Sequence, residues 1–206
     1  MPASRKTIDL ELDALLQPVT FNDYCPNGLQ VQGKDEISRL VSGVTACEAL
    51  IDQAIQEQAD MILVHHGYFW RGEDPTITGI KHQRLKRLLT HDINLFAYHL
   101  PLDVHPELGN NAQLGALLEL QPTGEFALYQ GRCIGLVGRL KKPCTVASLA
   151  ERIGSRLGRK PLTIDGARGE ISTVAWCTGA AQGYIEEAVA AGADAYITGE
   201  ASEPTV

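Results

Sequence analysis

The chain has 206 residues, a formal net charge of −7 and a hydrophobic content of 44%, which is ordinary for a globular protein. It is long enough to bury the core of one large domain or two modest ones, and its acidic balance disfavours binding to nucleic acid. No apolar run approaches the ~20 residues that cross a bilayer, and five scattered cysteines without C-x-x-C spacing indicate reduced thiols, so we expect a cytoplasmic protein that does not bind membranes.

Strands and helices are expected to alternate through the first 120 residues. The spacing of apolar residues predicts an opening helix over residues 8–16, which Pro18 closes, and a loop over residues 21–29. The pattern then predicts, in chain order, a strand at 40–45, a helix at 48–58, a strand at 61–64, a helix at 83–89, a strand at 93–98 and a helix around 110–118. Continuous apolar strands separated by helices are typical of a sheet that is covered on both faces, so the expected fold class is α/β.

The second half of the chain repeats part of the first half. Residues 37–66 align without a gap to residues 171–200 at an offset of 134. Identical residues stand at Ile37 and Ile171, Ser38 and Ser172, Ala46 and Ala180, Ile51 and Ile185, Ala54 and Ala188, Ala59 and Ala193, and Asp60 and Asp194. Because both segments have the pattern strand, helix, Ala-Asp, strand, we expect them to build the same βαβ unit.

The repeat predicts two related halves. Residues 1–120 are the first α/β half, and residues 121–206 are an inserted small α/β layer followed by the start of the second half. The insert is expected to contain a strand at 133–140, a helix at 146–157 and a strand at 162–164. By the offset, Gly199 corresponds to His65 and the counterpart of His99 would stand near position 233, so we expect the last βα units of the second half to be missing.

Two consecutive histidines close the strand predicted at residues 61–64. In open α/β sheets ligands bind outside the carboxyl ends of the strands, so His65 and His66 stand where a site is expected. Because neighbouring residues on a strand point to opposite faces, the two imidazoles suit two ions, one each, unless the chain turns at once, as Gly67 permits. From these residues alone, the alternative that one or both histidines only cap the strand stays open.

A second group of polar residues follows the strand predicted at residues 93–98. His99 and Asp103 are expected at the same edge as His65 and His66, because both strands belong to one half of the protein. Imidazole and carboxylate together suit zinc, manganese, iron or nickel, and they offer too few oxygens for calcium. We therefore predict His65, His66 and Asp103 as metal ligands, with a helix N-cap as the alternative for Asp103. His99 is a ligand, a partner that orients a ligand, or a general base.

Other chemical signals in the sequence are weaker. Glu200 and Glu203 stand at the corresponding end of the second half and are candidates for lining the site, although a solvated first turn of a helix is the favoured interpretation. The sequence has neither a P-loop fingerprint nor a Gly-x-Ser-x-Gly nucleophile elbow. The histidine-rich strand ends therefore carry the functional prediction.

Six short stretches give the chain its resemblance to a known family. They are Asp23-Tyr24-Cys25-Pro26-Asn27-Gly28-Leu29-Gln30-Val31, Val64-His65-His66-Gly67-Tyr68-Phe69-Trp70, His99-Leu100-Pro101-Leu102-Asp103, Asn110-Asn111, Ala175-Trp176-Cys177-Thr178-Gly179 and Ile197-Thr198-Gly199-Glu200. At these residues the sequence resembles the Ngg-interacting-factor-three-like family, dinuclear-metal proteins that are often labelled GTP cyclohydrolase I type 2 homologues. The stretches span nearly the whole chain in family order, and they resemble most the bacterial single-core members.

The resemblance implies a fold, an assembly and a ligand set. It implies a two-lobed α/β fold and a ring-shaped homohexamer with two divalent metal ions per subunit facing its cavity. By the family pattern His65 and His66 bind different ions, Asp103 binds one of them, and His99 is not a ligand. The family completes its site with a Gly-His-His-x-x-Glu-like segment near the C-terminus, which has no counterpart here. This departure agrees with the gap inferred from the internal repeat.

The leading functional hypothesis is a metal-dependent hydrolase that acts on a nucleotide or a related small molecule. Its nucleophile would be a water whose pKa a metal ion lowers toward ~7, with His99 as the candidate general base. The alternatives are a metal-stabilised, ring-shaped scaffold or adaptor without catalysis, and an inactive truncated form. An open coordination position favours the enzyme, and fully closed coordination favours the scaffold.

Overall fold

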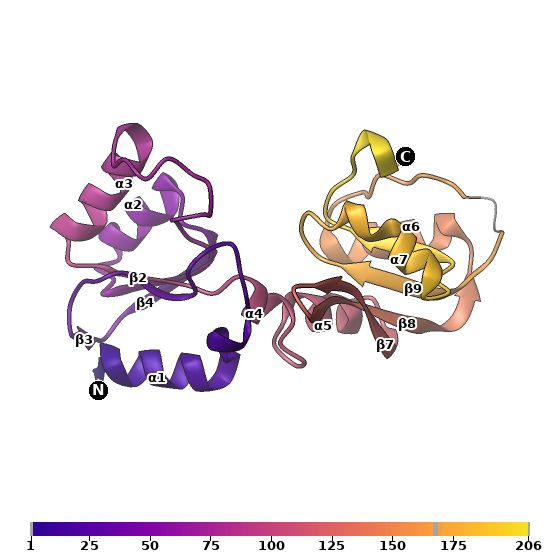
Figure 1. Ribbon diagram of the computed structural model, residues 1–206, viewed down its shortest axis with the longest axis horizontal. Coiled ribbons are helices and arrows are strands. Elements are labelled where there is room, and N and C mark those ends of the chain that lie inside the picture. The colour runs from indigo at the N-terminus through magenta and orange to yellow at the C-terminus, as the bar shows by residue number, and fades with distance from the viewer. Residues whose placement is uncertain (1, 167–168, 206) are drawn as a thin grey trace. The chain divides into compact units, whose positions relative to one another are not determined.

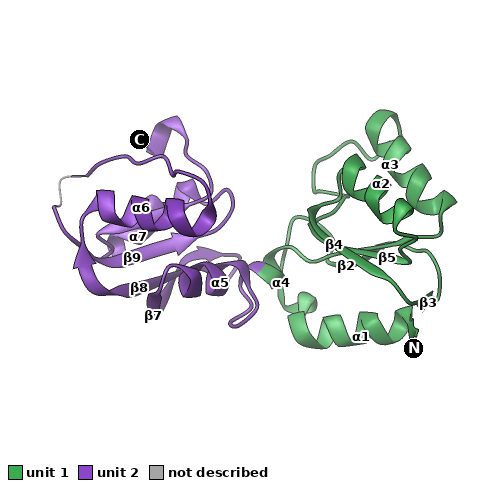
Figure 2. Cartoon of the chain, turned by 180° about the vertical axis from the view of Figure 1, so that it is seen from behind, with its two compact units in different colours: residues 1–102 green, residues 103–206 purple. Residues whose placement is uncertain are grey.

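The protein is divided into two compact units, residues 1–102 and residues 103–206 (Figure 2). The structure, a computed structural model, describes residues 2–166 and 169–205. None of the helices in the described part of the chain is long and apolar enough to span a membrane.

The first unit is built around a four-stranded sheet with the strand order β2-β6-β5-β4. Its three parallel strands are β4 (Leu40–Thr45), β5 (Met61–His66) and β6 (Asn94–Ala97), and β2 (Gly28–Val31) pairs with β6 in the antiparallel direction. A separate two-stranded ribbon joins β1 (Ala3–Ser4) to β3 (Glu36–Ile37).

Helices cover both faces of this sheet, as Figure 1 shows. Helices α2 (Glu48–Gln56) and α3 (Gly79–Thr90) lie on one face, and α1 (Arg5–Leu16), which the short helix η1 (Pro18–Thr20) follows, lies on the other. Ile62 and Val64 of β5 belong to the buried cluster that packs against α2 and α3, whereas Met61 belongs to the cluster on the side of α1. The alternation along β5 explains why its sequence is continuously apolar before the two histidines.

The second unit contains another four-stranded sheet, with the order β10-β9-β8-β7. Its strands are β7 (Leu120–Tyr129), β8 (Arg132–Cys144), β9 (Ile171–Cys177) and β10 (Ala195–Thr198). Its helices are α5 (Asn110–Leu117), α6 (Val146–Leu157) and α7 (Ile185–Ala190), with short helices at η2 (Gln182–Tyr184) and η3 (Glu203–Thr205). The short helix α4 (Leu100–Asp103) includes the boundary between the two units. Trp176 packs with residues of α5 and α6, and Ala175 packs with Ala188 of α7, so this sheet is also covered on both faces.

The internal repeat predicted from the sequence is present in the structure. Strands β4 and β5 pair with Leu40 opposite Met61, and strands β9 and β10 pair with Val174 opposite Ala195, which is the same register at the offset of 134. The aspartates of the repeat also have the same role. Asp60 Oδ2 accepts hydrogen bonds from the backbone amides of Ser38 and Arg39, at 2.9 and 3.1 Å. Asp194 Oδ2 accepts them from the equivalent amides of residues 172 and 173, at 3.0 and 2.9 Å.

The α/β class and the order of elements in the repeat are confirmed, but three local predictions were wrong. The strand predicted at 162–164 is absent from the described chain, because Leu162 and Ile164 are 79% and 51% exposed and no neighbouring strand pairs with them. Strand β7 was missed because Pro122 and Gly124 are typical of a loop, and here they accompany an irregularity in its pairing with β8. Strand β2 begins inside the loop predicted at 21–29.

Candidate metal centre

The predicted histidines stand at the ends of two neighbouring parallel strands of the first unit. His65 and His66 are the last residues of β5, and His99 follows β6 by two residues. Because Val64 of β5 pairs with Ala97 of β6 in parallel, both strands end at the same edge of the sheet. One ligand atom from each of the three imidazoles lies within 4.8 Å of the others. The ring centroids are 4.4 Å apart for His65 and His66, 4.9 Å for His65 and His99, and 5.7 Å for His66 and His99.

Gly67 lets the chain leave the strand immediately after this pair. A Cβ at this position would stand 2.1 Å from Gln30 Oε1 and 2.7 Å from Ala97 Cβ, so no other residue fits without a shift of its neighbours. Gln30 Oε1 accepts a hydrogen bond from the Tyr68 amide at 2.7 Å, which fixes the next residue of the turn. The glycine that the sequence showed to permit a turn here is thus needed because the side chains of Gln30 and Ala97 approach it closely.

Hydrogen bonds determine which imidazole nitrogens can act as ligands. His65 Nδ1 lies 3.1 Å from the Tyr98 carbonyl oxygen, and a carbonyl oxygen can only accept, so Nδ1 carries the hydrogen. The lone pair of neutral His65 is therefore on Nε2. His66 Nδ1 lies 3.3 Å from Thr45 Oγ1, which can donate or accept. Backbone carbonyls and carboxylates commonly orient metal-binding histidines in this way.

His99 is held by a buried carboxylate that the sequence analysis gave no role. Asp23 Oδ1 and Oδ2 lie 3.0 and 3.2 Å from His99 Nδ1, and the side chains of Asp23 and His99 are only 2% and 7% exposed. Burial alone would raise the pKa of Asp23, but hydrogen bonds from His99 and Asn27 outweigh it and hold the pKa below its usual value. The ionised carboxylate accepts the Nδ1 hydrogen, so the Nε2 of neutral His99 keeps its lone pair.

Further donors saturate Asp23. Its oxygens also accept hydrogen bonds from Asn27 Nδ2 at 3.0 Å, from the Leu100 amide at 3.0 Å and from the Tyr24 amide at 2.7 Å. The only signal for it in the sequence was its place in a turn-forming stretch, because 76 residues separate it from His99. The structure thus adds Asp23 to the predicted residues.

Asp23, His99 and Cys25 have ligand atoms within 4.8 Å of one another, which is a second arrangement with the spacing of a metal site. Burial, together with the Asp23 carboxylate, raises the pKa of the Cys25 thiol to about 12. A thiol binds a metal well only as the thiolate. His65, His66 and His99 are therefore the better set of ligands.

Asp103, the predicted carboxylate ligand, is the last residue of the short helix α4 and the first residue of the second unit. Its Oδ1 accepts hydrogen bonds from Asn110 Nδ2 at 2.7 Å and from Thr178 Oγ1 at 3.4 Å, both in that unit. Glu200 and Glu203 are exposed and lie after β10, in keeping with the solvated turn that was favoured for them.

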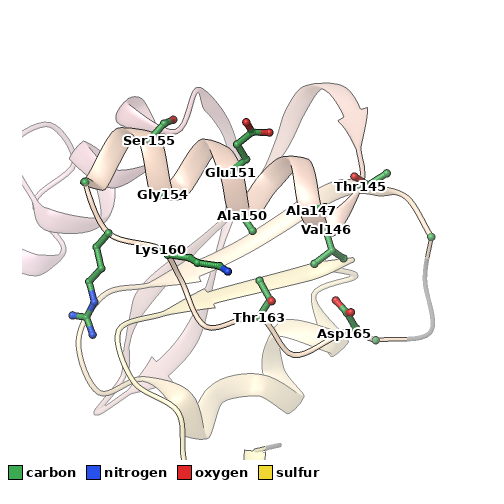
Figure 3. Close-up of a pocket in the computed structure, with 14 residues that line it drawn as sticks. Thr145, Val146, Ala147, Ala150, Glu151, Gly154, Ser155, Lys160, Thr163 and Asp165 are labelled. Atoms are coloured by element: carbon green, nitrogen blue, oxygen red, sulfur yellow. The ribbon is translucent and has the colours of Figure 1, made fainter.

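A cavity of about 1010 Å³ lies elsewhere in the second unit, between α6 and the chain that follows it (Figure 3). Glu151, Lys160 and Asp165 are among the side chains that line it. None of the predicted site residues lines it.

Known proteins match the chain along almost its whole length. A family described as Duf34/NIF3 (NGG1p interacting factor 3) matches residues 3–206. A Pseudomonas aeruginosa protein called "GTP cyclohydrolase 1 type 2 homolog" is 51% identical over 206 residues, which are 100% of this chain and 81% of the relative. A relative of the same name from Escherichia coli K12 is 50% identical, over 98% of this chain and 81% of its own length.

Solved structures show the same relationship. A structure described as protein ybgI, of unknown function, has a TM-score of 0.93 and 48% identity over 98% of this chain and 81% of that one. The crystal structure of TTHA1606 from Thermus thermophilus has a TM-score of 0.85 and 33% identity over 98% of this chain and 80% of that one.

Proposed function

The chain belongs to the Duf34/NIF3 family, and we propose that it is a divalent-metal-binding protein that hydrolyses nucleotides or related small molecules. The name of its curated relatives, GTP cyclohydrolase 1 type 2 homolog, favours a nucleotide substrate. The proposal therefore depends on the chemistry of the histidine cluster.

The observation that supports it best is the convergence of three imidazoles with ligand atoms within 4.8 Å of one another. Two of the three, His65 and His99, have their Nδ1 hydrogen directed to a carbonyl or carboxylate oxygen, which leaves Nε2 as the donor atom. Histidines without a common role have no physical reason to share one tautomer. A nitrogen-rich set of this kind suits zinc, manganese, iron or nickel.

In the proposed site His65 and His66 bind metal, and Asp103 supplies the carboxylate ligand. We also propose two ions per subunit, with His65 bound to one ion and His66 to the other. A divalent ion bound there would act as a Lewis acid and lower the pKa of a water molecule toward ~7.

His99 is the proposed proton acceptor. Asp23 fixes its Nδ1 hydrogen, so Nε2 can take a proton from the attacking water while the carboxylate stabilises the imidazolium that forms. Asp23 does not touch the substrate and acts only through His99. In this proposal the chain supplies three metal ligands, His65, His66 and Asp103, and a base that Asp23 positions.

The experiment that tests this function is a hydrolysis screen on a panel of nucleotides, with the purified chain treated with chelator and then resupplied with zinc, manganese, iron or nickel. We expect activity that the chelator abolishes and that one of these metals restores. The double variant His65→Ala/His66→Ala should lose it. The matched control is His82→Ala, because His82 is an exposed histidine of α3 outside the cluster.

The competing function, a metal-stabilised ring-shaped scaffold, has a different outcome in the same experiment. Metal would be bound and lost in the double variant, yet no hydrolysis would respond to the chelator. The homohexamer implied by the family resemblance is also a proposal, and light scattering of the purified chain measures it directly.

A further inference from the structure

Two aromatic side chains of the first unit stand beside the three imidazoles. The Tyr24 and Trp70 rings lie 5.0 and 5.2 Å from the His99 ring between centroids, and both meet it edge-on, at 70° and 83°. Trp70 also lies 5.9 Å from the His66 ring. The two aromatic rings are 5.7 Å apart and inclined by only 37°. We call Tyr24 and Trp70 the aromatic wall.

Local hydrogen bonds hold the wall in place. Trp70 Nε1 donates to the Gly67 carbonyl at 3.3 Å, which fixes the indole over the turn that follows the histidines. The Arg71 amide donates to the Tyr24 carbonyl at 2.7 Å, and Arg71 Nη2 donates to the Asp23 carbonyl at 2.8 Å. The loop that carries Asp23 is therefore tied to the loop that follows β5, and both rings are positioned together.

The backbone is also strained at this point. Phe69 has a φ of 66°, which is rare for a bulky residue and is energetically unfavourable. Such strain persists where the surrounding structure requires it, and it occurs most often at functional sites. Here it lies between Tyr68, whose ring is buried, and Trp70, whose ring lies near His66 and His99.

Core packing does not account for the wall. Among the described residues, the two buried clusters of the first unit include Tyr68 but neither Tyr24 nor Trp70, and Tyr24 is 39% exposed. Two rings tied down at a partly exposed position offer a π surface with little conformational entropy left to lose on binding.

We propose that the aromatic wall binds the planar heteroaromatic ring of a nucleotide, which places the rest of that ligand beside the histidine cluster. This rests on the proposed function, because it names the residues that bind the base of the nucleotide proposed there. A ligand for this place needs an apolar face to stack on the wall and a polar edge toward the imidazoles. A nucleobase has both, whereas an aliphatic chain or a bare sugar phosphate has no π face.

Binding measurements with GMP and ribose 5-phosphate separate the contribution of the ring from that of the phosphate. The full chain is titrated with each ligand by calorimetry, once with metal and once with chelator. Aromatic stacking contributes ~1–3 kcal/mol per base, so we expect GMP to bind on the order of 10-fold more tightly or better. The preference should persist with chelator, since the wall contains no metal ligand.

Variants test the two rings individually. Tyr24→Leu and Trp70→Leu should each weaken GMP binding on the order of 10-fold and leave ribose 5-phosphate unchanged, whereas Trp70→Phe should retain the affinity for GMP. The matched control is Phe69→Leu, because Phe69 is 36% exposed in the same loop but contacts Tyr68 and Lys81 instead of the imidazoles. Trp fluorescence reports the location, because Trp176 is fully buried and quenching by GMP must come from Trp70.

The outcomes are distinct. Equal affinities for GMP and ribose 5-phosphate, or wild-type GMP affinity in both leucine variants, would overturn the proposal and show that the rings only cover His99. If a leucine variant unfolds, two measurements still test the proposal. They are the affinities of the wild-type chain for GMP and ribose 5-phosphate, and the fluorescence of Trp70→Phe. If the chain prefers GMP but binds no metal when metal is supplied, the proposed hydrolase function is wrong and the proposed role of the aromatic wall is not.

Discussion

Replacing Asp23 by Asn exchanges one buried oxygen for an NH₂ group and leaves the shape of the side chain unchanged. In the wild-type protein the carboxylate accepts from His99 Nδ1 and Asn27 Nδ2 and from the amides of Tyr24 and Leu100. In either orientation, the Asn side chain directs its NH₂ at two of these donors. Leaving a buried donor unpaired costs ~1–3 kcal/mol, so we expect Asp23→Asn to lower the free energy of unfolding by about 2–4 kcal/mol.

The same substitution should change the tautomer of His99. When the NH₂ group takes the place of Oδ1, the oxygen nearest His99 Nδ1, this nitrogen becomes an acceptor and the hydrogen moves to Nε2, which then has no lone pair for a proton or an ion. Loss of an orienting partner of this kind typically costs 10–100-fold in metal affinity or activity. We expect a decrease of that size in any chelator-sensitive activity.

Urea unfolding measures the stability change, and long-range ¹H–¹⁵N correlation spectra of the histidine rings identify the nitrogen that carries the hydrogen. His82→Ala serves as the control for unrelated histidine changes, since His82 lies outside the cluster. A variant that keeps the Nδ1–H tautomer of His99 and is as active as the wild type would refute the reasoning.

Three further predictions concern acid stability, the turn and the repeat. The folded pKa of Asp23 lies below its unfolded value, so its stabilising contribution is present above ~pH 4 and is lost as the pH falls through the folded pKa. The free energy of unfolding between pH 2 and 5 should therefore depend less on pH in Asp23→Asn than in the wild type. Gly67→Ala should lower the free energy of unfolding by about 1–3 kcal/mol and weaken metal binding, because the new Cβ would meet Gln30 Oε1 at 2.1 Å; a variant with wild-type stability would contradict the close approach. Asp60→Ala should lower the free energy of unfolding by about 2–4 kcal/mol, because it leaves two part-buried backbone amides without an acceptor. Asp194→Ala should lower it by less, because one of its two amides is exposed to water, and thermal unfolding that is unchanged by either substitution would argue against the shared role.

The repeat shows what the sequence could predict. The gapless offset of 134 predicted that both segments build the same βαβ unit, and the structure shows that β9 pairs with β10 in the same register as β4 with β5. The sequence showed the shared Ala-Asp dipeptide as a match between the two halves, but it did not show why the aspartate occurs in both. Only the structure shows that Asp60 and Asp194 accept hydrogen bonds from two successive amides near the start of β4 and of β9.

Local patterns failed where pairing between distant parts of the chain decides the conformation. Strand β7 contains Pro122 and Gly124, and it forms because β8 pairs along nearly all of its length. Conversely, Leu162 and Ile164 look apolar enough for a strand, yet no partner strand is available to them among the described residues. Propensity is a weak guide when tertiary pairing overrides it.

The candidate site was predictable to the extent that it follows strand ends. His65, His66 and His99 were expected at one edge, and the parallel pairing of β5 with β6 puts them there. Asp23, Tyr24 and Trp70 had no assigned role, because they reach the cluster through loops whose course no periodicity describes. The role of Asp103 as a ligand stays a prediction.

X-ray absorption spectroscopy of the zinc-loaded chain tests the central claim most directly, because imidazole ligands give a multiple-scattering pattern that water and carboxylate lack. For the wild-type chain we predict a pattern that corresponds to an average of at least one histidine per bound zinc ion. This pattern should be lost in His65→Ala/His66→Ala and retained in His82→Ala. A zinc spectrum with oxygen or sulfur neighbours only, or one that the double substitution leaves unchanged, would contradict the account.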